Sequence, residues 1–178
     1  DNKFYYIRVK SSESVKYSID LKITEFIKVA KLEQKISLDI DDENLTAEDV
    51  DTDKLIDSLI NIISESTDID EKDIEVKTVQ LINILTGEIE EVLYQKGVLS
   101  RINFRTTESG KRIEADIVTD VNTKGEDTET YENEIEQLRS AVEKSSEISE
   151  KLTNTITKEI INTEKPITVS SESQVTEE

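Results

Sequence analysis

The chain has 178 residues, of which 34% are hydrophobic, 35% are charged and 4% are aromatic, and its net charge is −19. It contains no His, Cys, Met or Trp, which excludes imidazole acid–base catalysis, thiolate nucleophiles, zinc thiolate sites and disulfides. The acidic balance argues against a nucleic-acid partner, because phosphate binding needs a basic surface, and no apolar run is long enough to insert in a membrane as a helix.

The N-terminal segment differs from the rest of the chain in charge and in aromatic content. Residues 1–37 carry eight Lys or Arg against five Asp or Glu, a net charge of +3, whereas the remaining residues carry 14 against 36, a net charge of −22. Residues 15–23 alternate between apolar and polar side chains, which predicts a strand. We expect residues 1–32 to form a basic, aromatic arm, which is either a strand of the same domain or a contact to a neighbouring subunit. The predicted assembly residues are Phe4, Tyr5, Tyr6, Arg8 and Tyr17.

The next segment predicts a strand, an acidic loop and a helix. Apolar residues alternate over residues 33–40, which is typical of a strand. Leu and Ile then repeat at helical spacing up to about residue 66, after Asp51 or Thr52 as the cap. We expect Leu59 and Ile60 to lie in the buried face of this helix.

The middle of the chain is punctuated by its four glycines. They lie at positions 87, 97, 110 and 125, each between strand-like segments, and Gly supplies the positive φ that tight hairpins need. The spacing predicts an antiparallel meander from about residue 73 to residue 121. A short helix over residues 80–94 is the alternative.

The C-terminal part predicts two helices and a last strand. Apolar residues repeat at helical spacing over residues 128–162, and the phase changes at Ser145-Ser146, which predicts a kink or a short turn there. Pro166 cannot continue a helix, and the apolar residues that follow it predict a short strand over residues 167–169. Residues 171–178 are expected to be a polar tail.

The order strand, helix, strands, helix, strand predicts an α+β domain over residues 33–170. The expected architecture is ferredoxin-like (βαββαβ), an antiparallel sheet with helices on one face, together with an inserted hairpin and the N-terminal strand arm.

Two segments resemble SEA-like domains of extracellular proteins, which also occur in fibrous surface appendages of algae and other protists. Residues 36–79 resemble their first half, where a strand and an acidic loop precede a helix. Residues 134–171 resemble their second half, where a helix breaks at a pair of small residues before a second helix and a closing strand. The resemblance covers about residues 34–170 and implies a ferredoxin-like, extracellular domain. The self-cleaving Gly-Ser motif of true SEA domains is missing, so autoproteolysis is not implied.

An acidic cluster precedes the first predicted helix. Carboxylate oxygens of this kind suit calcium, although the Gly and Glu that an EF-hand requires are replaced by Asn44 and Val50. A solvated loop and a helix N-terminus that favours carboxylates explain the same pattern. We therefore expect no cofactor, with calcium as the candidate cation. The calcium candidates are Asp39, Asp41, Glu43, Asp49 and Asp51.

Asn44-Leu45-Thr46 is a sequon that permits glycosylation of Asn44 if the chain is secreted. The chain begins with Asp1 instead of Met, which is the trace that a removed secretory signal or pro-segment would leave. Together with the resemblance, the missing Met favours an extracellular or cell-surface location, with a virion as the alternative.

The sequence predicts a protein that is not an enzyme. The first hypothesis is a structural subunit of an extracellular filament or surface assembly, which polymerises through strand and arm contacts with copies of itself or related subunits. The second is a virion structural protein matured by a protease. The third is an adhesion or ligand-binding module, which would present a concave apolar groove.

Overall fold

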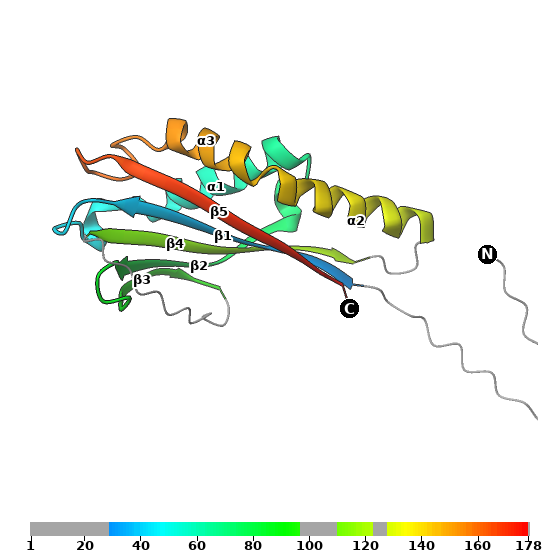
Figure 1. Ribbon diagram of the computed structural model, residues 1–178, viewed down its shortest axis with the longest axis horizontal. Coiled ribbons are helices and arrows are strands. Elements are labelled where there is room, and N and C mark those ends of the chain that lie inside the picture. Colours follow the sequence, from blue (N-terminus) through cyan, green and yellow to red (C-terminus); the bar gives the residue numbers. More distant parts are fainter. Residues whose placement is uncertain (1–28, 97–109, 123–127, 178) are drawn as a thin grey trace, which may run out of the picture.

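The computed structural model describes residues 29–96, 110–122 and 128–177, which form an α+β structure with one five-stranded antiparallel sheet and three α-helices (Figure 1). The strand order is β3-β2-β4-β1-β5, and every neighbouring pair is antiparallel. The strands are β1 (Val29–Ile40), β2 (Ile74–Asn83), β3 (Ile89–Gln95), β4 (Lys111–Asn122) and β5 (Ile167–Glu177). The helices are α1 (Thr52–Thr67), α2 (Thr128–Glu143) and α3 (Ser145–Thr155).

The helices lie together along one side of the twisted sheet (Figure 1). Alternate side chains of β1 and β4 are fully or almost fully buried, among them Leu32, Ile36 and Ile117, and they join the buried residues of all three helices in one hydrophobic cluster. Ile, Leu and Val supply nearly all of this core, as the scarcity of aromatic residues predicts. The two faces of the sheet therefore differ: one is apolar beneath the helices, and the other, which we call the polar face, carries charged and hydroxyl side chains.

Strand β1 lies between β4 and β5 and starts earlier than predicted. The sequence predicts an arm over residues 1–32 and a strand from residue 33. This boundary is wrong, because Ala30 and Leu32 are fully buried within β1. The same alternation simply continues toward the N-terminus.

Helix α1 forms where helical spacing predicts it. The Asp51 carboxylate accepts a hydrogen bond from the Lys54 N–H at 3.2 Å and caps the first turn, and the helix ends at Asp68 in the left-handed region, with φ +58°. Leu59 is fully buried, as predicted, whereas Ile60 is half-buried at the edge of the core.

The β2–β3 hairpin turns at Gly87, whose φ is +69°, as the glycine pattern predicts. The alternative helix over residues 80–94 is therefore wrong. The meander is also wrong, because β4 does not pair with β3 but with the other edge of β2. Strand β4 carries three almost fully buried apolar side chains that need a central position, whereas the charged β3 sequence tolerates an edge.

Gly110 sits where the chain enters β4. It has φ +126°, and a Cβ atom there would lie 2.5 Å from the carbonyl oxygen of Ile40, so that only Gly fits without movement of the backbone. Its carbonyl accepts a hydrogen bond from the Ile84 N–H at 3.0 Å. The predicted turn glycine thus fixes the start of β4 against the end of β1.

Helices α2 and α3 break at Lys144, next to the predicted Ser145-Ser146 pair. The predicted end of the helical region at residue 162 is wrong, because α3 ends at Thr155. Ile160 and Ile161 are buried in the turn that follows, where the Ile160 carbonyl accepts a hydrogen bond from the Asp51 N–H at 2.8 Å. Their apolar spacing reflects packing against the start of α1, not a continued helix.

Strand β5 differs most from its prediction. We expected a strand over residues 167–169 and a polar tail over 171–178, but β5 runs to Glu177 and pairs with β1 throughout. Strands β4 and β5 run parallel to each other with β1 between them, and β1 and β2 run parallel with β4 between them.

Candidate functional site

The described sheet ends in two outer strands, β5 and β3, and the longer of them is regular. Strand β5 pairs with β1 from Ile167 to Glu177 with no register shift. Its side chains alternate between half-buried positions toward the helices and exposed positions on the polar face. Within the described residues no strand pairs with its second edge, so a row of backbone N–H and C=O groups is left without a strand partner there.

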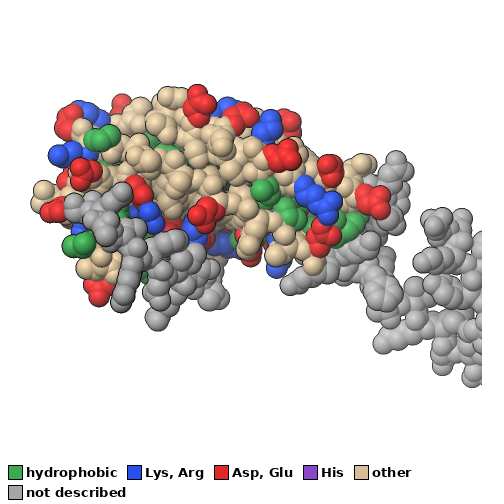
Figure 2. Space-filling view, in the orientation of Figure 1, with side chains coloured by type: hydrophobic (Ala, Val, Ile, Leu, Met, Phe, Trp, Pro, Cys, Tyr) green, Lys and Arg blue, Asp and Glu red, His purple; other side chains and the backbone are tan. Residues whose placement is uncertain are grey.

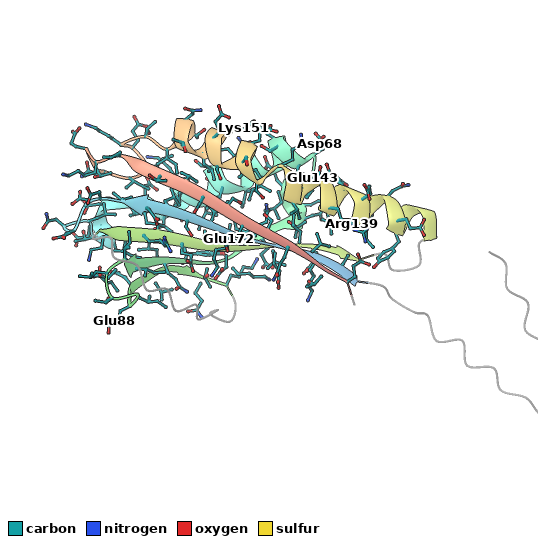
Figure 3. All side chains as sticks on the ribbon, in the orientation of Figure 1. Asp68, Glu88, Arg139, Glu143, Lys151 and Glu172 are labelled. Atoms are coloured by element: carbon teal, nitrogen blue, oxygen red, sulfur yellow. The ribbon has the colours of Figure 1, made fainter. Side chains whose placement is uncertain are left out.

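Strand β5 is held in place by contacts to β1 and to the helices. Val169 and Val175 pack against the core cluster. The guanidinium of Arg139 on α2 lies 2.7 Å from the carboxylate of Glu177, which ties the end of the strand to the helix layer (Figure 3 labels Arg139 on α2 and Glu172 on β5). The hydroxyl oxygens of Ser173 and Ser145 lie 3.1 Å apart. The outer edge is therefore fixed in position.

Strand β3 is a less regular edge. It has seven residues, and its pairing with β2 contains two register shifts. Ile89 and Val92 remain 39% and 38% exposed, and Leu85 in the preceding turn is 61% exposed. Bulges of this kind twist an edge away from regular pairing.

The polar face carries ion pairs that cross the strands. The Lys35 ammonium lies 2.9 Å from a carboxylate oxygen of Glu114 and 3.5 Å from one of Asp116, and the Thr78 hydroxyl donates to Asp116 at 2.8 Å. Lys35 and Glu114 side chains are only 13% and 5% exposed. Glu172 of β5 is exposed beside Lys35 in the strand register, and no cation of the described part of the chain lies within ion-pair distance of it.

Figure 2 shows that acidic and basic side chains are spread over the face in view, while hydrophobic side chains reach it in small patches. Among the described residues, this face thus carries charges of both signs and no large apolar patch.

A second ion pair joins β3 to β4. The Lys111 ammonium lies 2.5 Å from the carboxylate of Glu90, and its side chain is 10% exposed. The hydrogen bond from Lys111 is the main cause that lowers the pKa of Glu90 below its ordinary value, and Asn83 contributes a further hydrogen bond. Because the pKa of Glu90 is lower in the folded than in the unfolded state, this pair stabilises the fold above the unfolded pKa of about 4.3, and the stabilisation is lost as the pH falls through the folded pKa.

We expect Glu90→Gln to lower the melting temperature at pH 7, because it leaves the nearly buried Lys111 ammonium without its anion. The variant should also lose less stability than the original chain between pH 6 and acid pH, because one of the carboxylates that must protonate is gone. Thermal melts followed by circular dichroism over this pH range measure both effects. Glu88→Gln is the matched control, since Glu88 projects from the hairpin tip (Figure 3) and should change neither value. Identical pH profiles for both variants would contradict the assignment.

The structure gives the calcium candidates separate roles instead of bringing them together. Asp39 forms a two-pronged ion pair with Arg112, with N–O distances of 2.5 and 2.8 Å. Asp49 accepts the backbone N–H and the hydroxyl of Thr46, which lower its pKa, and the pKa of Asp51 is lowered by its hydrogen bonds with Lys54. Asp41 and Glu43 are exposed.

Over the described residues, no group of three or more Asp or Glu has the geometry to hold a metal ion. Calcium binding therefore stays a prediction without support from this loop.

Asn44 lies in a turn in which its backbone N–H donates to the Asp42 carboxylate at 3.1 Å. The residue is exposed, as glycosylation of the sequon requires. Its glycosylation stays a prediction.

A shallow hollow of about 620 Å³ opens beside α1, lined by Asp57, Ile60, Asn61, Asp70, Glu71 and Lys72. These mostly charged and amide side chains do not form the apolar groove that a binding module would present.

The predicted assembly residues Phe4, Tyr5, Tyr6, Arg8 and Tyr17 lie outside the described residues. Among the described helices, none is long and apolar enough to cross a membrane.

Neither a family model, nor a curated protein, nor a solved structure matches the chain.

Sequence reasoning missed the long β5 edge. Its signal was present, because Val169, Ser171, Ser173 and Val175 alternate with exposed polar residues. Two of the half-buried positions, Ser171 and Ser173, are polar, so the alternation of apolar and polar residues is not visible at these two positions. Hydropathy alone does not distinguish a half-buried serine from an exposed one.

Proposed function

We propose that the chain is a non-enzymatic structural subunit of an extracellular filament or surface assembly, which works without a cofactor and polymerises through strand and arm contacts with other copies or related subunits. The observation that carries the proposal is the completeness of the described sheet. Both sides of β1 are occupied, by β4 and β5, and the described residues form one hydrophobic cluster among themselves. This supports a role for the strand-patterned arm in contacts to a neighbour.

Charge supports the same proposal. The segment that includes the arm has a net charge of +3 and the rest of the chain −22, so an arm is attracted to the acidic body of another copy. Exposed charges are screened over about 8–10 Å near physiological salt, so this attraction weakens as the salt concentration rises.

We further propose that the fold is ferredoxin-like with β3 as an addition, and that the resemblance to SEA-like domains reflects this architecture. With β3 set aside, the strand order is β2-β4-β1-β5. Two strand–helix–strand units, β1-α1-β2 and β4-α2-α3-β5, then interleave, which supports the βαββαβ arrangement. Strand β3 takes the place of the predicted inserted hairpin.

The test compares the full chain with a chain that lacks residues 1–28. The deletion stops before Val29, because β1 begins there. Size-exclusion chromatography with light scattering should find concentration-dependent association of the full chain that weakens in high salt, and a folded monomer after the deletion. Association that the deletion leaves unchanged, in low and high salt alike, would contradict the proposal, and so would a full chain that stays monomeric.

A matched pair of full-length variants separates the arm's apolar face from its charge. Ile19→Lys places a cation on the apolar side of the alternating segment, whereas Ser18→Lys adds the same charge on its polar side. We expect Ile19→Lys to abolish association and Ser18→Lys to retain it. Equal behaviour of the two variants would show that no strand of this pattern is involved.

A further inference from the structure

Strand β5 carries few of the devices by which proteins protect a sheet edge. Such edges are normally short, bulged, covered, or marked by Pro and charged side chains, Lys above all. Strand β5 has eleven residues and pairs without a register shift, it contains neither Lys nor Pro, and its charged residues are Glu172 and Glu177. No described strand covers its outer edge. Strand β3, at the other end of the sheet, is shorter and has two register shifts. Of the two edges, β5 is the better template for an added strand.

The arm contains a segment that matches this edge. Residues 15–23 alternate strictly over nine positions, which is within the length of β5. Placed beside β5, their apolar side chains continue the face that bears Val169 and Val175, and the polar side that includes Lys16 and Lys22 continues the face that bears the exposed Glu172. Both the apolar pattern and the charge are therefore complementary.

We propose, as a step that rests on the function proposed above, that residues 15–23 of one copy add to β5 of another copy as an antiparallel strand. The direction follows from the described sheet, in which every pair is antiparallel, and purely antiparallel sheets are over-represented among proteins.

In the antiparallel direction, the length of the tether requires that the donor is a second copy. Ala30 lies opposite Glu177, so the start of β1 lies at the C-terminal end of β5. An antiparallel strand that seats residues 15–23 on β5 ends at or before Val169, about nine residues or roughly 30 Å away at about 3.3 Å per residue. The six steps from Ile23 to Val29 reach at most about 21 Å. A chain therefore cannot place its own arm on its own β5 in this direction, although it can do so in the parallel direction.

Disulfide trapping tests this proposal without background, because the chain has no Cys. Full-length chains with Ser170→Cys or Gln174→Cys are each mixed with chains of a different tag that carry Lys16→Cys, Ser18→Cys, Asp20→Cys or Lys22→Cys, and cross-linked dimers are measured after oxidation. Both β5 residues are exposed on the polar face. Facing residues in a strand pair lie close enough for a disulfide.

The expected result is a mixed dimer at one arm position for each β5 variant, with the best arm position four residues earlier for Gln174→Cys than for Ser170→Cys. A shift of the same size toward later positions would mean parallel pairing and would overturn the proposal. Cross-links of Ser170→Cys chains to each other would overturn the proposal, because they would show that β5 pairs with β5 of another copy. Cross-links of the arm variants to Val92→Cys would overturn it too, because they would place the arm on β3.

The same samples separate this inference from the proposed function. If the chains associate by light scattering but no arm position cross-links to β5, the antiparallel β5 contact is wrong and the assembly proposal stands. If the full chain stays monomeric at all concentrations, the proposed function itself fails.

Discussion

Replacing Leu59 with Asp should leave the chain unfolded at 25 °C. Leu59 is fully buried in α1 within the single core cluster. The substitution removes a buried side chain, which costs about 2–5 kcal/mol, and adds the cost of a buried carboxylate without a partner. The sum of these two costs is a large part of the free energy of unfolding of a typical domain, which is roughly 5–15 kcal/mol. Circular dichroism and a urea titration measure the result.

Ile60→Asp is the matched control, because Ile60 is the next residue of the same helix and is half-buried beside the shallow hollow. This variant should fold with reduced stability. A soluble Leu59→Asp protein that melts cooperatively would rule out the placement of α1. Equal loss of structure in both variants would mean that the face of α1 is assigned wrongly.

The second large effect concerns the ion pair on the polar face. Lys35→Met should destabilise the fold by about 3 kcal/mol, because it leaves the Glu114 carboxylate buried without its cation. The double variant Lys35→Met/Glu114→Met should recover most of this loss, since replacing both members of a buried pair with apolar residues is often neutral. Asp116 loses its contact with Lys35 in both variants but keeps the hydrogen bond from Thr78. Urea unfolding of the single and double variants forms a double-mutant cycle that isolates the interaction.

Lys54→Met is the control for this cycle. Its ammonium lies 2.9 Å from Asp51, much like the distance in the buried pair, but the Lys54 side chain is 56% exposed. We expect little change there, because water screens an exposed pair. A similar loss of stability in Lys35→Met and Lys54→Met would show that burial does not set the strength of these ion pairs. A double variant as unstable as Lys35→Met would show that the unpaired Glu114 carboxylate is not the cause of the loss.

The sequence correctly predicts the elements that are determined by interactions between residues close together in the chain. Helix α1 follows from apolar spacing and an Asp cap, the β2–β3 hairpin from Gly87, and the break between the last two helices from the change of phase at Ser145. In each case the deciding interaction is local: a helical face, a cap or a positive φ.

The failures have a different cause, since tertiary partners decided them. Strand β5 is polar enough to be taken for a tail, and it is a strand because β1 offers it an edge and α2 and α3 cover its inner side. The place of β4 between β2 and β1 likewise depends on burial of Ile113 and Ile117 against helices far away in the sequence.

The candidate site follows the same rule. Among the acidic residues before α1, the cap role of Asp51 is predicted from the sequence and confirmed. The bonds of Asp49 to Thr46 were missed, although capping chemistry is a local signal that could have revealed them. The pair of Asp39 with Arg112 could not be predicted, because it depends on the register between β1 and β4.

The placement of β1 between β4 and β5 has a kinetic consequence. Strand β1 is the first described strand, and its neighbours begin at Lys111 and Ile167. Long loops must close before these contacts form, and proteins dominated by such non-local pairings fold slowly, in milliseconds to seconds. During synthesis, β1 has no partner until most of the chain has emerged, so a buried apolar strand waits with both edges unpaired. We expect folding to be a late event of synthesis, and ribosome-bound chains that end before residue 167 to be the species most prone to aggregation.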